Sequence, residues 1–361
     1  MSFSTYRCLL MTTDPVHIGT GGMRLGRVDN SIVREPGTRL PKIPGTSLSG
    51  AIRSYAAHRY GKRGCAGKDG HCGRPTCPIC YTFGSVKGSG SELSYSGIVS
   101  IGDARLLLFP VYSMAGPVWV TSPAVLQDFG ISSEAVSNNK AKWNGGITSK
   151  KQINLGWLMA EKEGNDWTLP KELKDDLPNP ASNRIVLISD KLFSQVVNSN
   201  LEVRTSVAIN PETGAAEDGA LFTYEAIPRA AFLWTDVVTD DYRESFPDIN
   251  RLNMWDGILK SQNEKAKSEI LKKWHLLKES SDNSQILKAK EEASEWIADS
   301  LKHWNERAIR DVNPKSSIGL ITSGLDWAEH LGIGGMGTRG FGRVKKISCK
   351  QIHPVELPKG N

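Results

Sequence analysis

Short apolar runs rich in β-branched and bulky residues recur along the chain and predict strands. The clearest of them occupy residues 5–13, 99–113, 182–189 and 201–210. The last run and a further one at residues 220–228 flank the turn-rich stretch PETGAAEDG. Two strand signals separated by such a turn predict a β-hairpin.

Helical spacing predicts a first helix after Pro44-Gly45, where Leu48, Ile52 and Tyr55 share one face and Thr46 or Ser47 is the expected N-cap. A longer helical segment extends from about Tyr242 to Val312, with Lys and Glu between its apolar positions. We expect two or three amphipathic helices there. Their apolar stripes are Ile270-Trp274-Leu277 and Ala293-Ile297-Leu301-Trp304.

The chain closes with GLITSGLDWAEHL, which predicts a short strand or helix, then a glycine-rich loop and a basic strand. Strands that alternate with few helices, plus one helical block, favour an α+β fold.

Composition narrows the functional classes only a little. The 361 residues carry a formal net charge of +6, with 39% hydrophobic and 23% charged residues. A mild positive excess is compatible with a nucleic-acid partner but does not require one. No apolar run is long enough to cross a bilayer, and the N-terminus lacks the pattern of a secretory signal. We therefore expect a soluble, cytoplasmic protein without a membrane partner.

Four cysteines lie close together in the sequence, whereas Cys8 and Cys349 stand alone in strand-like segments and are expected to be small core residues. Four thiolates suit a tetrahedral zinc ion, and the CPIC pair has the spacing of a zinc knuckle. His71 is an alternative to one thiolate, and four reduced cysteines without a metal are the other interpretation. We expect structural Zn²⁺, bound by Cys65, Cys72, Cys77 and Cys80.

Two glycine-rich loops are candidates for phosphate contact, because glycine lets backbone N–H groups approach an anion closely. The first is HIGTGG, which starts at His17, and the second is GIGGMGTRGFGR, which starts at Gly332 and carries Arg339 and Arg343. A basic strand rather than a long helix follows the second loop, so it does not fit a dinucleotide fingerprint. Tight turning alone is the alternative explanation for both loops.

Asp29 stands in a loop with Arg24, Arg27 and Arg34. A carboxylate among arginines commonly forms an ion pair. The alternative is a carboxylate that holds a metal ion or accepts a proton beside a bound phosphodiester. His17 is either a polar partner at such a site or a buried, satisfied histidine.

Taken together, these motifs resemble the RAMP superfamily of CRISPR systems. The resemblance rests on PVHIGTG, VDNSIVRE, LPKIPGTSLSGAIR and GIGGMGTRGFGRV. The segments GDARLLLFPVYSMAGPVWVTSPAVL and ETGAAEDGALFTYEAIPR are similar to the backbone subunit of the Cmr (type III-B) effector complex. The likeness covers most of residues 6–130, 201–235 and 317–348, and it does not extend to the cysteine segment or the helical block.

The resemblance implies a ferredoxin-like (RRM-like) palm with a thumb hairpin, and the cysteine spacing and the helical periodicity predict two insertions into it. The expected palm covers residues 1–235 and is completed by residues 316–361. Within it we expect a zinc-binding insertion at 61–92 and a thumb hairpin at about 201–230. Residues 236–315 are expected to be a helical insertion, which should contact protein rather than RNA because its charges are mixed.

The resemblance also implies a function. Such subunits form a filament of identical copies along the CRISPR guide RNA, together with other type III effector subunits. They cleave bound target RNA at regular intervals in a reaction that needs a divalent cation, Mg²⁺ or Mn²⁺. The implied catalytic residues are Asp29, with His17, Tyr224 and Glu225 near it.

Guide binding is implied for the start of the first helix and for the second glycine-rich loop. The residues concerned are Lys42, Ser47, Ser49, Arg53, Gly334, Gly335, Gly337, Arg339 and Arg343. Relatives usually carry lysine where this chain has Ser49, which weakens one expected phosphate contact. Three alternatives remain open: a structural backbone subunit that does not cleave, the equivalent subunit of the Csm branch, and a stand-alone endoribonuclease that processes CRISPR transcripts.

Overall fold

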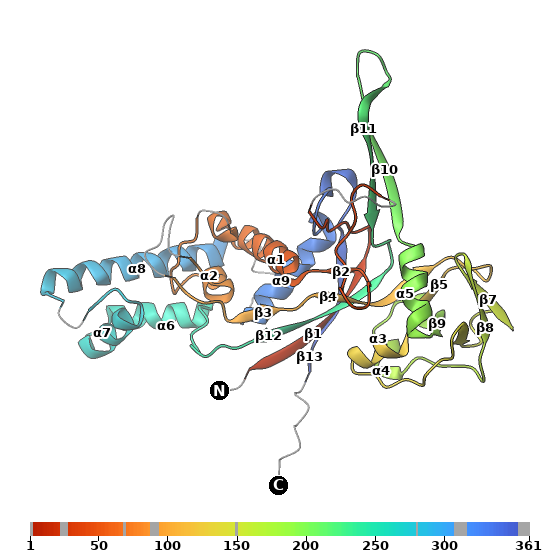
Figure 1. Ribbon diagram of the computed structural model, residues 1–361. Coiled ribbons are helices and arrows are strands. Elements are labelled where there is room, and N and C mark those ends of the chain that lie inside the picture. The colour runs from red at the N-terminus through yellow and green to blue at the C-terminus, as the bar shows by residue number, and fades with distance from the viewer. Residues whose placement is uncertain are drawn as a thin grey trace, which may run out of the picture.

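The computed structural model (Figure 1) has an α+β fold built around one mixed sheet, as the sequence predicts. None of its described helices is both long and apolar enough to cross a membrane. The structure describes residues 3–21, 28–67, 70–86, 94–148, 151–278, 281–306 and 316–352.

Antiparallel strands in the order β13-β1-β12-β4 form the central part of the sheet. Helix α1 (Gly45–Tyr60) lies between β1 and β4 in the chain, and α9 (Ser317–Leu331) connects β12 to β13. This order and pairing are those of a ferredoxin-like βαββαβ unit. The strands are β1 (Ser4–Thr12), β4 (Ala104–Val111), β12 (Phe232–Thr239) and β13 (Val344–Ile352), with short strands β2 (Lys42–Ile43) and β3 (Val99–Ile101) beside β4 and β12.

Helices α1 and α9 pack closely together. A Cβ atom on Gly324 of α9 would lie 2.5 Å from the carbonyl oxygen of Ile52 in α1, so the lack of a side chain permits this approach. Leu48 and Ile52 bury the face of α1 that the spacing predicts. The region predicted as a short strand or helix is thus the helix α9.

The sheet continues beyond β4 through a second group of strands. These pair in the order β5-β9-β6-β8-β7, and Figure 1 shows them at the end of the molecule opposite the helical block. Every residue of β5 and β9 is buried, which is typical of strands in the interior of a sheet that is covered on both faces. The strands are β5 (Val118–Thr121), β6 (Lys140–Trp143), β7 (Gln152–Leu155), β8 (Leu158–Lys162) and β9 (Ile185–Ile188), and the helices beside them are α3 (Pro123–Asp128), α4 (Lys171–Lys174) and α5 (Asp190–Ser199).

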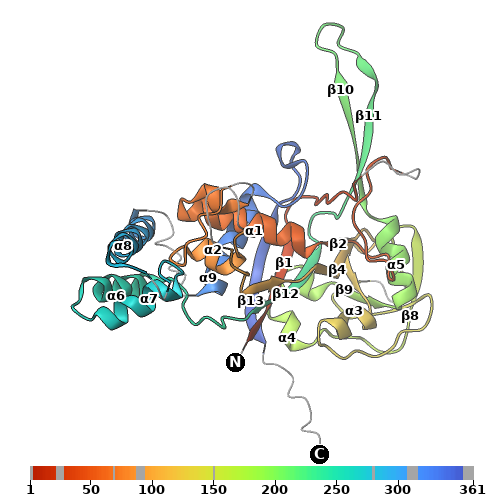
Figure 2. The ribbon, with the colours of Figure 1, turned by 60° about the vertical axis from the view of Figure 1, so that its left-hand side comes forward.

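A long hairpin projects from the body of the molecule in both views (Figures 1 and 2). Its strands β10 (Glu202–Ile209) and β11 (Ala216–Ala226) form a sheet of their own. Most of β10 is exposed, which leaves the outer part of the hairpin without a core. Its base is anchored instead, since Glu225, Ala226 and Ile227 are buried.

The helical block and the cysteine segment form one lobe with its own apolar core. The core joins Cys65, Cys77 and Cys80 to Trp274, Trp304 and other residues of the helices. Figure 2 shows α6, α7 and α8 beside α2. The elements are the 3₁₀ helix η1 (Arg63–Ala66), α2 (Pro78–Phe83), α6 (Ile249–Lys260), α7 (Glu264–Lys273) and α8 (Asn283–Glu306).

Two small features differ in part from the expectations. The N-cap of α1 is Pro44, and neither Thr46 nor Ser47 caps the helix. Cys8 is buried in the core and Cys349 packs against it, as expected, but the two do not stand alone: they are opposite each other on β1 and β13, and a disulfide joins them. Positions 341 residues apart cannot be recognised as partners from the sequence.

Candidate functional site

The loop that carries Asp29 lies along the base of the hairpin. The backbone N–H of Asn30 donates to the carbonyl oxygen of Thr223 at 3.0 Å, and that of Glu225 donates to the carbonyl of Asn30 at 3.0 Å. The loop therefore adds to the edge of β11 as a short extra segment of sheet. The neighbouring Arg24 and Arg27 lie outside the described residues.

The Asp29 carboxylate is held by one residue of β11. Its Oδ2 accepts two hydrogen bonds from Thr223, from the backbone N–H at 2.8 Å and from Oγ1 at 2.8 Å. In return, the Asp29 N–H donates to Thr223 Oγ1 at 3.0 Å. Hydrogen bonds from the Thr223 backbone and hydroxyl lower the pKa of Asp29 below its ordinary value. The carboxylate is thus ionised throughout the neutral range.

His17 lies on the buried side of the same site. Its Nδ1 is 2.7 Å from the carbonyl oxygen of Glu225, and because a carbonyl only accepts, Nδ1 is the donor. Its ring meets that of Tyr224 edge-on, with 5.8 Å between ring centroids. His17 is only 7% exposed, so this geometry supports a satisfied, positioning histidine.

Glu225 forms a partly buried ion pair rather than facing open solvent. Its Oε1 accepts from Nη2 of Arg34 at 2.6 Å, and Oε2 accepts from the N–H of Ile32 at 3.3 Å. Arg34 also donates to the side chain of Asn198 at 2.9 Å and to the Ile32 carbonyl at 3.1 Å. The pair therefore fixes the segment that follows Asp29 against β11.

The second glycine-rich loop closes over the His17 loop. The Gly335 N–H donates to the His17 carbonyl at 3.1 Å. Gly334 has φ +93°, and a Cβ there would lie 2.3 Å from Ile18 Cδ1 and 2.6 Å from the His17 carbonyl oxygen. Only glycine fits this position without displacing the backbone.

The charged residues of that loop point in two directions. Arg339 Nη1 donates to Ser206 Oγ of the hairpin at 3.1 Å and lies 3.5 Å from the Tyr224 hydroxyl. Arg343 Nε is 3.4 Å from Asp14 Oδ2, and the arginine side chain is 55% exposed, so this ion pair contributes little stability. Gly337 begins a short 3₁₀ turn (Gly337–Arg339) in which no residue is buried. The loop thus links the hairpin base to the first strand.

The start of α1 differs from what was expected. Asp103 occupies it: its Oδ1 accepts from the Gly45 N–H at 2.7 Å, and its Oδ2 accepts from Lys42 at 2.5 Å. Lys42 is therefore paired with a carboxylate. Ser47 and Ser49 are both partly exposed on the first turns of the helix.

Arg53 turns into the cysteine segment. It donates to the carbonyl oxygens of Cys65 at 2.9 Å and Gly84 at 2.9 Å, and it lies 2.6 Å from His71 Nδ1. Its guanidinium therefore holds that segment, and its expected contact with the guide stays a prediction. The same contact occupies His71, which does not join the cysteine cluster.

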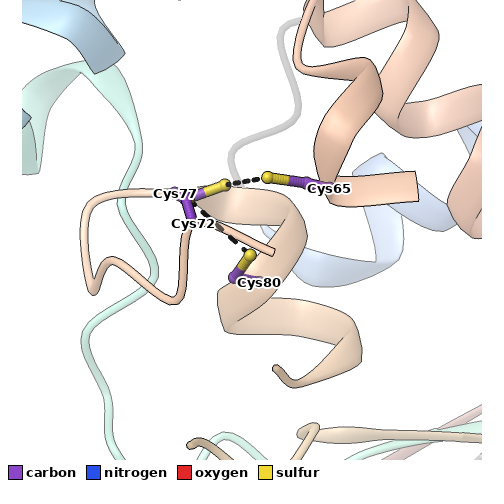
Figure 3. Close-up of side chains that lie close together, drawn as sticks. All are labelled: Cys65, Cys72, Cys77 and Cys80. Carbon is purple, nitrogen blue, oxygen red and sulfur yellow. Dashed lines mark hydrogen bonds between the residues drawn. The ribbon is translucent and has the colours of Figure 1, made fainter. Parts of the chain in front are cut away.

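The four clustered cysteines converge on one point (Figure 3). Their sulfur atoms all lie within 4.8 Å of one another, with 3.8 Å between Cys72 and Cys80 and 3.9 Å between Cys65 and Cys77. A tetrahedral ion with Zn–S bonds of about 2.3 Å sets its sulfurs about 3.8 Å apart. The arrangement therefore has the size of a four-thiolate zinc site, without an open position for chemistry.

Cationic groups surround this cluster. Burial lowers the pKa of Arg53, although the nearby thiols oppose the shift. Burial also acts to lower the pKa of Lys62, but Cys77, Cys72 and the hydrogen-bonded Asp299 together outweigh it and the net pKa is raised. Two positive side chains beside four thiols are suited to offset the negative charge of a metal–tetrathiolate centre.

A model of the RAMP superfamily matches residues 9–345. The chain belongs to the RAMP superfamily. It is 30% identical over 245 residues to the CRISPR system Cmr endoribonuclease Cmr4 of Pyrococcus furiosus, a match that covers 61% of this chain and 76% of that protein. The expected likeness to the Cmr backbone subunit is confirmed.

Solved structures support the same fold. A chain of the type III-B Cmr-beta complex in its apo state superposes with a TM-score of 0.51 at 16% identity, over 67% of this chain and 86% of that one. A crystal structure of Cmr4 has a TM-score of 0.50 at 20% identity, over 97% of this chain and all of the other. At these identities the likeness concerns the fold.

Three residues of the site were not found from the sequence, namely Thr223, Asn198 and Asp103. Each acts on a residue between 58 and 194 positions away. Thr223 lies in a strand of the hairpin, where threonine is common, so the residue type alone does not indicate a functional role. The carboxylate of Asp103 in SIGDAR was a visible clue, since a charged residue inside the predicted strand 99–113 needs a partner.

Proposed function

We propose that this chain is the guide-binding backbone subunit of a Cmr-type CRISPR effector complex and that it cleaves target RNA. The observation that carries the proposal is the ionised Asp29 carboxylate, held at the base of a projecting hairpin beside a glycine-rich, arginine-bearing loop. The name of the Cmr4 relative, an endoribonuclease, supports the same activity.

Asp29 is suited to act on a 2′-hydroxyl of the target RNA. The hydroxyl oxygen attacks the adjacent phosphorus while the bond to the 5′ oxygen of the next nucleotide breaks. The products are a 2′,3′-cyclic phosphate and a 5′-hydroxyl, to which a proton is returned. Asp29 accepts the hydroxyl proton through Oδ1, the oxygen without a hydrogen-bond partner among the described residues.

A divalent cation, Mg²⁺ or Mn²⁺, fits this site if the substrate phosphate shares in its coordination. Mg²⁺ usually keeps several waters and binds through one or two carboxylates plus substrate phosphates, and Asp29 offers one such carboxylate. When bound, the cation supplies charge stabilisation at the phosphate. Glu225 is committed to Arg34, so Asp29 is the carboxylate that would hold the cation, as the alternative to accepting the hydroxyl proton.

Guide binding is assigned to the glycine-rich loop and to the first turns of α1. Gly334, Gly335 and Gly337 present backbone, and Arg339 and Arg343 present charge. Ser47 and Ser49 add hydroxyl donors at α1. Lys42 contributes only if a phosphate displaces Asp103, because both groups compete for the same ammonium.

The hairpin is suited to act as the thumb that displaces one base pair of the guide–target duplex. It projects far from the body, and its strands expose Ile209 and Leu221 at 60% and 63%. Apolar side chains of this kind can wedge between bases. With each copy of a filament placing one hairpin on the duplex, cleavage recurs at regular intervals.

The cysteine cluster is assigned a structural zinc ion, as its sulfur spacing supports. A stand-alone processing endoribonuclease centred on histidine is disfavoured by the burial of His17. Its Nδ1 is also committed to the Glu225 carbonyl.

Replacing Asp29 with alanine tests the activity. In the reconstituted complex with guide and partner subunits, Asp29→Ala should abolish cutting of complementary RNA while target affinity stays within about twofold, because a catalytic group contributes rate rather than binding. Single-turnover cleavage assays and target-binding titrations measure both. Cleavage at the wild-type rate by a fully assembled mutant complex would contradict the proposal and favour a structural backbone subunit.

A further inference from the structure

The hydroxyl of Thr223 stands between the hairpin and the Asp29 carboxylate. Its oxygen donates to Asp29 Oδ2 at 2.8 Å and accepts from the Asp29 N–H at 3.0 Å. The Thr223 N–H adds a second donor to the same carboxylate oxygen at 2.8 Å. One residue of β11 thus makes three hydrogen bonds to one residue of the opposing loop.

These bonds determine which carboxylate oxygen faces the reaction. Oδ2 accepts two donors from Thr223. Oδ1 has no hydrogen-bond partner within the part of the chain that the structure describes. A carboxylate on a single Cβ–Cγ bond rotates freely unless one oxygen is fixed, so the Thr223 contacts select a rotamer as well as a position.

The backbone around this contact is equally firm. The backbone N–H of Asn30 donates to the Thr223 carbonyl at 3.0 Å, and the Asn30 carbonyl accepts from the Glu225 N–H at 3.0 Å, so the two bonds flank Tyr224. On its other edge the loop pairs through Ile32 with Gly19. The segment around Asp29 is therefore tied by backbone hydrogen bonds to the base of the hairpin.

We propose that Thr223 is a positioning residue that couples the hairpin to the Asp29 carboxylate, so that a hairpin seated on the duplex presents Asp29 Oδ1 to the scissile nucleotide. This rests on the proposed function of Asp29. Thr223 touches no reacting atom itself. Its hydroxyl and backbone fix the orientation of the group that does.

The variant Thr223→Val keeps the β-branched shape of the side chain and the backbone donor, and it removes the hydroxyl. Loss of a hydrogen bond to a charged group should slow single-turnover cleavage about tenfold to a hundredfold, with target affinity unchanged. Thr223→Ser, which retains the hydroxyl, should restore cleavage to within about threefold of wild type. Rescue by serine separates positioning from a mere packing role.

Thr205 provides a matched control. It lies directly opposite Thr223 in the register of the same hairpin and is exposed. Thr205→Val removes a hydroxyl from an equivalent place without touching Asp29, and it should leave the cleavage rate unchanged. Equal slowing in both valine variants would show a general effect on the hairpin and would overturn the proposal.

The remaining outcomes separate the two hypotheses. If Asp29→Ala abolishes cleavage and Thr223→Val cuts at the wild-type rate, only the positioning role is wrong. If Asp29→Ala cuts normally, the proposed function of the site is wrong. Should Thr223→Val fail to assemble, Thr223→Ala carries the same test with a smaller side chain. Failure of both to assemble would assign Thr223 to folding and overturn the proposal.

Discussion

Glu225 and Arg34 form the ion pair on which the geometry of the site depends. Their side chains are only 11% and 16% exposed, and the N–O distance is 2.6 Å. Breaking a largely buried pair leaves one charge without compensation, which costs more than the pair itself contributes. We expect Glu225→Ala to lower the free energy of unfolding by about 2 kcal/mol or more. Glu225→Gln, which keeps a hydrogen-bond acceptor for Arg34, should cost less.

Urea unfolding of the isolated subunit measures these changes. Glu161 is a suitable control, because its ion pair with Lys140 is 56% and 39% exposed. Glu161→Ala should change stability by less than about 0.5 kcal/mol, as exposed pairs contribute little. Equal losses at the two sites would show that the Arg34 pair is not special.

At the scale of elements, the cysteine segment and the helical block stabilise each other. Thr76 Oγ1 donates to the Trp296 carbonyl at 3.2 Å, and Ser300 Oγ lies 3.1 Å from Thr76 Oγ1. Asp299 of α8 accepts from Lys62 at 2.5 Å and from Arg74 at 3.1 Å. The insertion is therefore an integral part of the lobe, and a metal that organises the cysteines also supports α8.

Metal removal should accordingly loosen the helices. We expect the protein to contain one zinc per chain by elemental analysis and to lose it in Cys77→Ser with Cys80→Ser. Hydrogen exchange should then rise in α6, α7 and α8 while β1 and β12 remain protected, because the palm has a separate core. Cys349→Ser is the control and should leave the zinc content unchanged. Absence of zinc, or unchanged exchange in these helices after its loss, would contradict the prediction.

The same elements show what the sequence could reveal. The pattern of apolar residues and the turn residues predicted β1, the hairpin and the helical block, because each is a continuous segment whose own sequence indicates its structure. Strands β6, β7 and β8, of four or five residues each, were missed, since runs this short do not show a period. The Asp29 loop, which we propose to be catalytic, was singled out by its motif. Its partner Thr223 was not, because strand pairing between distant segments leaves no local trace.

At the scale of the whole molecule, the candidate RNA-contacting parts and the helical lobe lie apart. Figures 1 and 2 show the hairpin projecting from the palm and α6, α7 and α8 at one end. The lobe carries acidic and basic side chains together, and several of them pair within it, such as Glu264 with Lys267 and Lys290. A surface neutralised in this way does not attract a phosphate backbone.

Two double variants test this division of surfaces. Arg339→Ala with Arg343→Ala should weaken guide RNA binding by the complex. It should also reduce the salt dependence of that binding, because fewer counterions are released when the protein neutralises fewer phosphates. For two contacts to single-stranded RNA, the slope of log K against log salt should fall by about 1.4. Affinity measured at several salt concentrations gives both quantities.

The control removes the same charge from the other surface. Lys265 and Lys272 are exposed on α7. Lys265→Ala with Lys272→Ala lowers the net charge by two, as the arginine variant does, but it should leave both the affinity and the salt slope unchanged. If the two double variants weaken binding equally, a diffuse field of the whole protein attracts the RNA. If the lysine variant alone weakens binding, the helical lobe is an RNA-binding surface, and its assignment as a protein-contacting insertion is wrong.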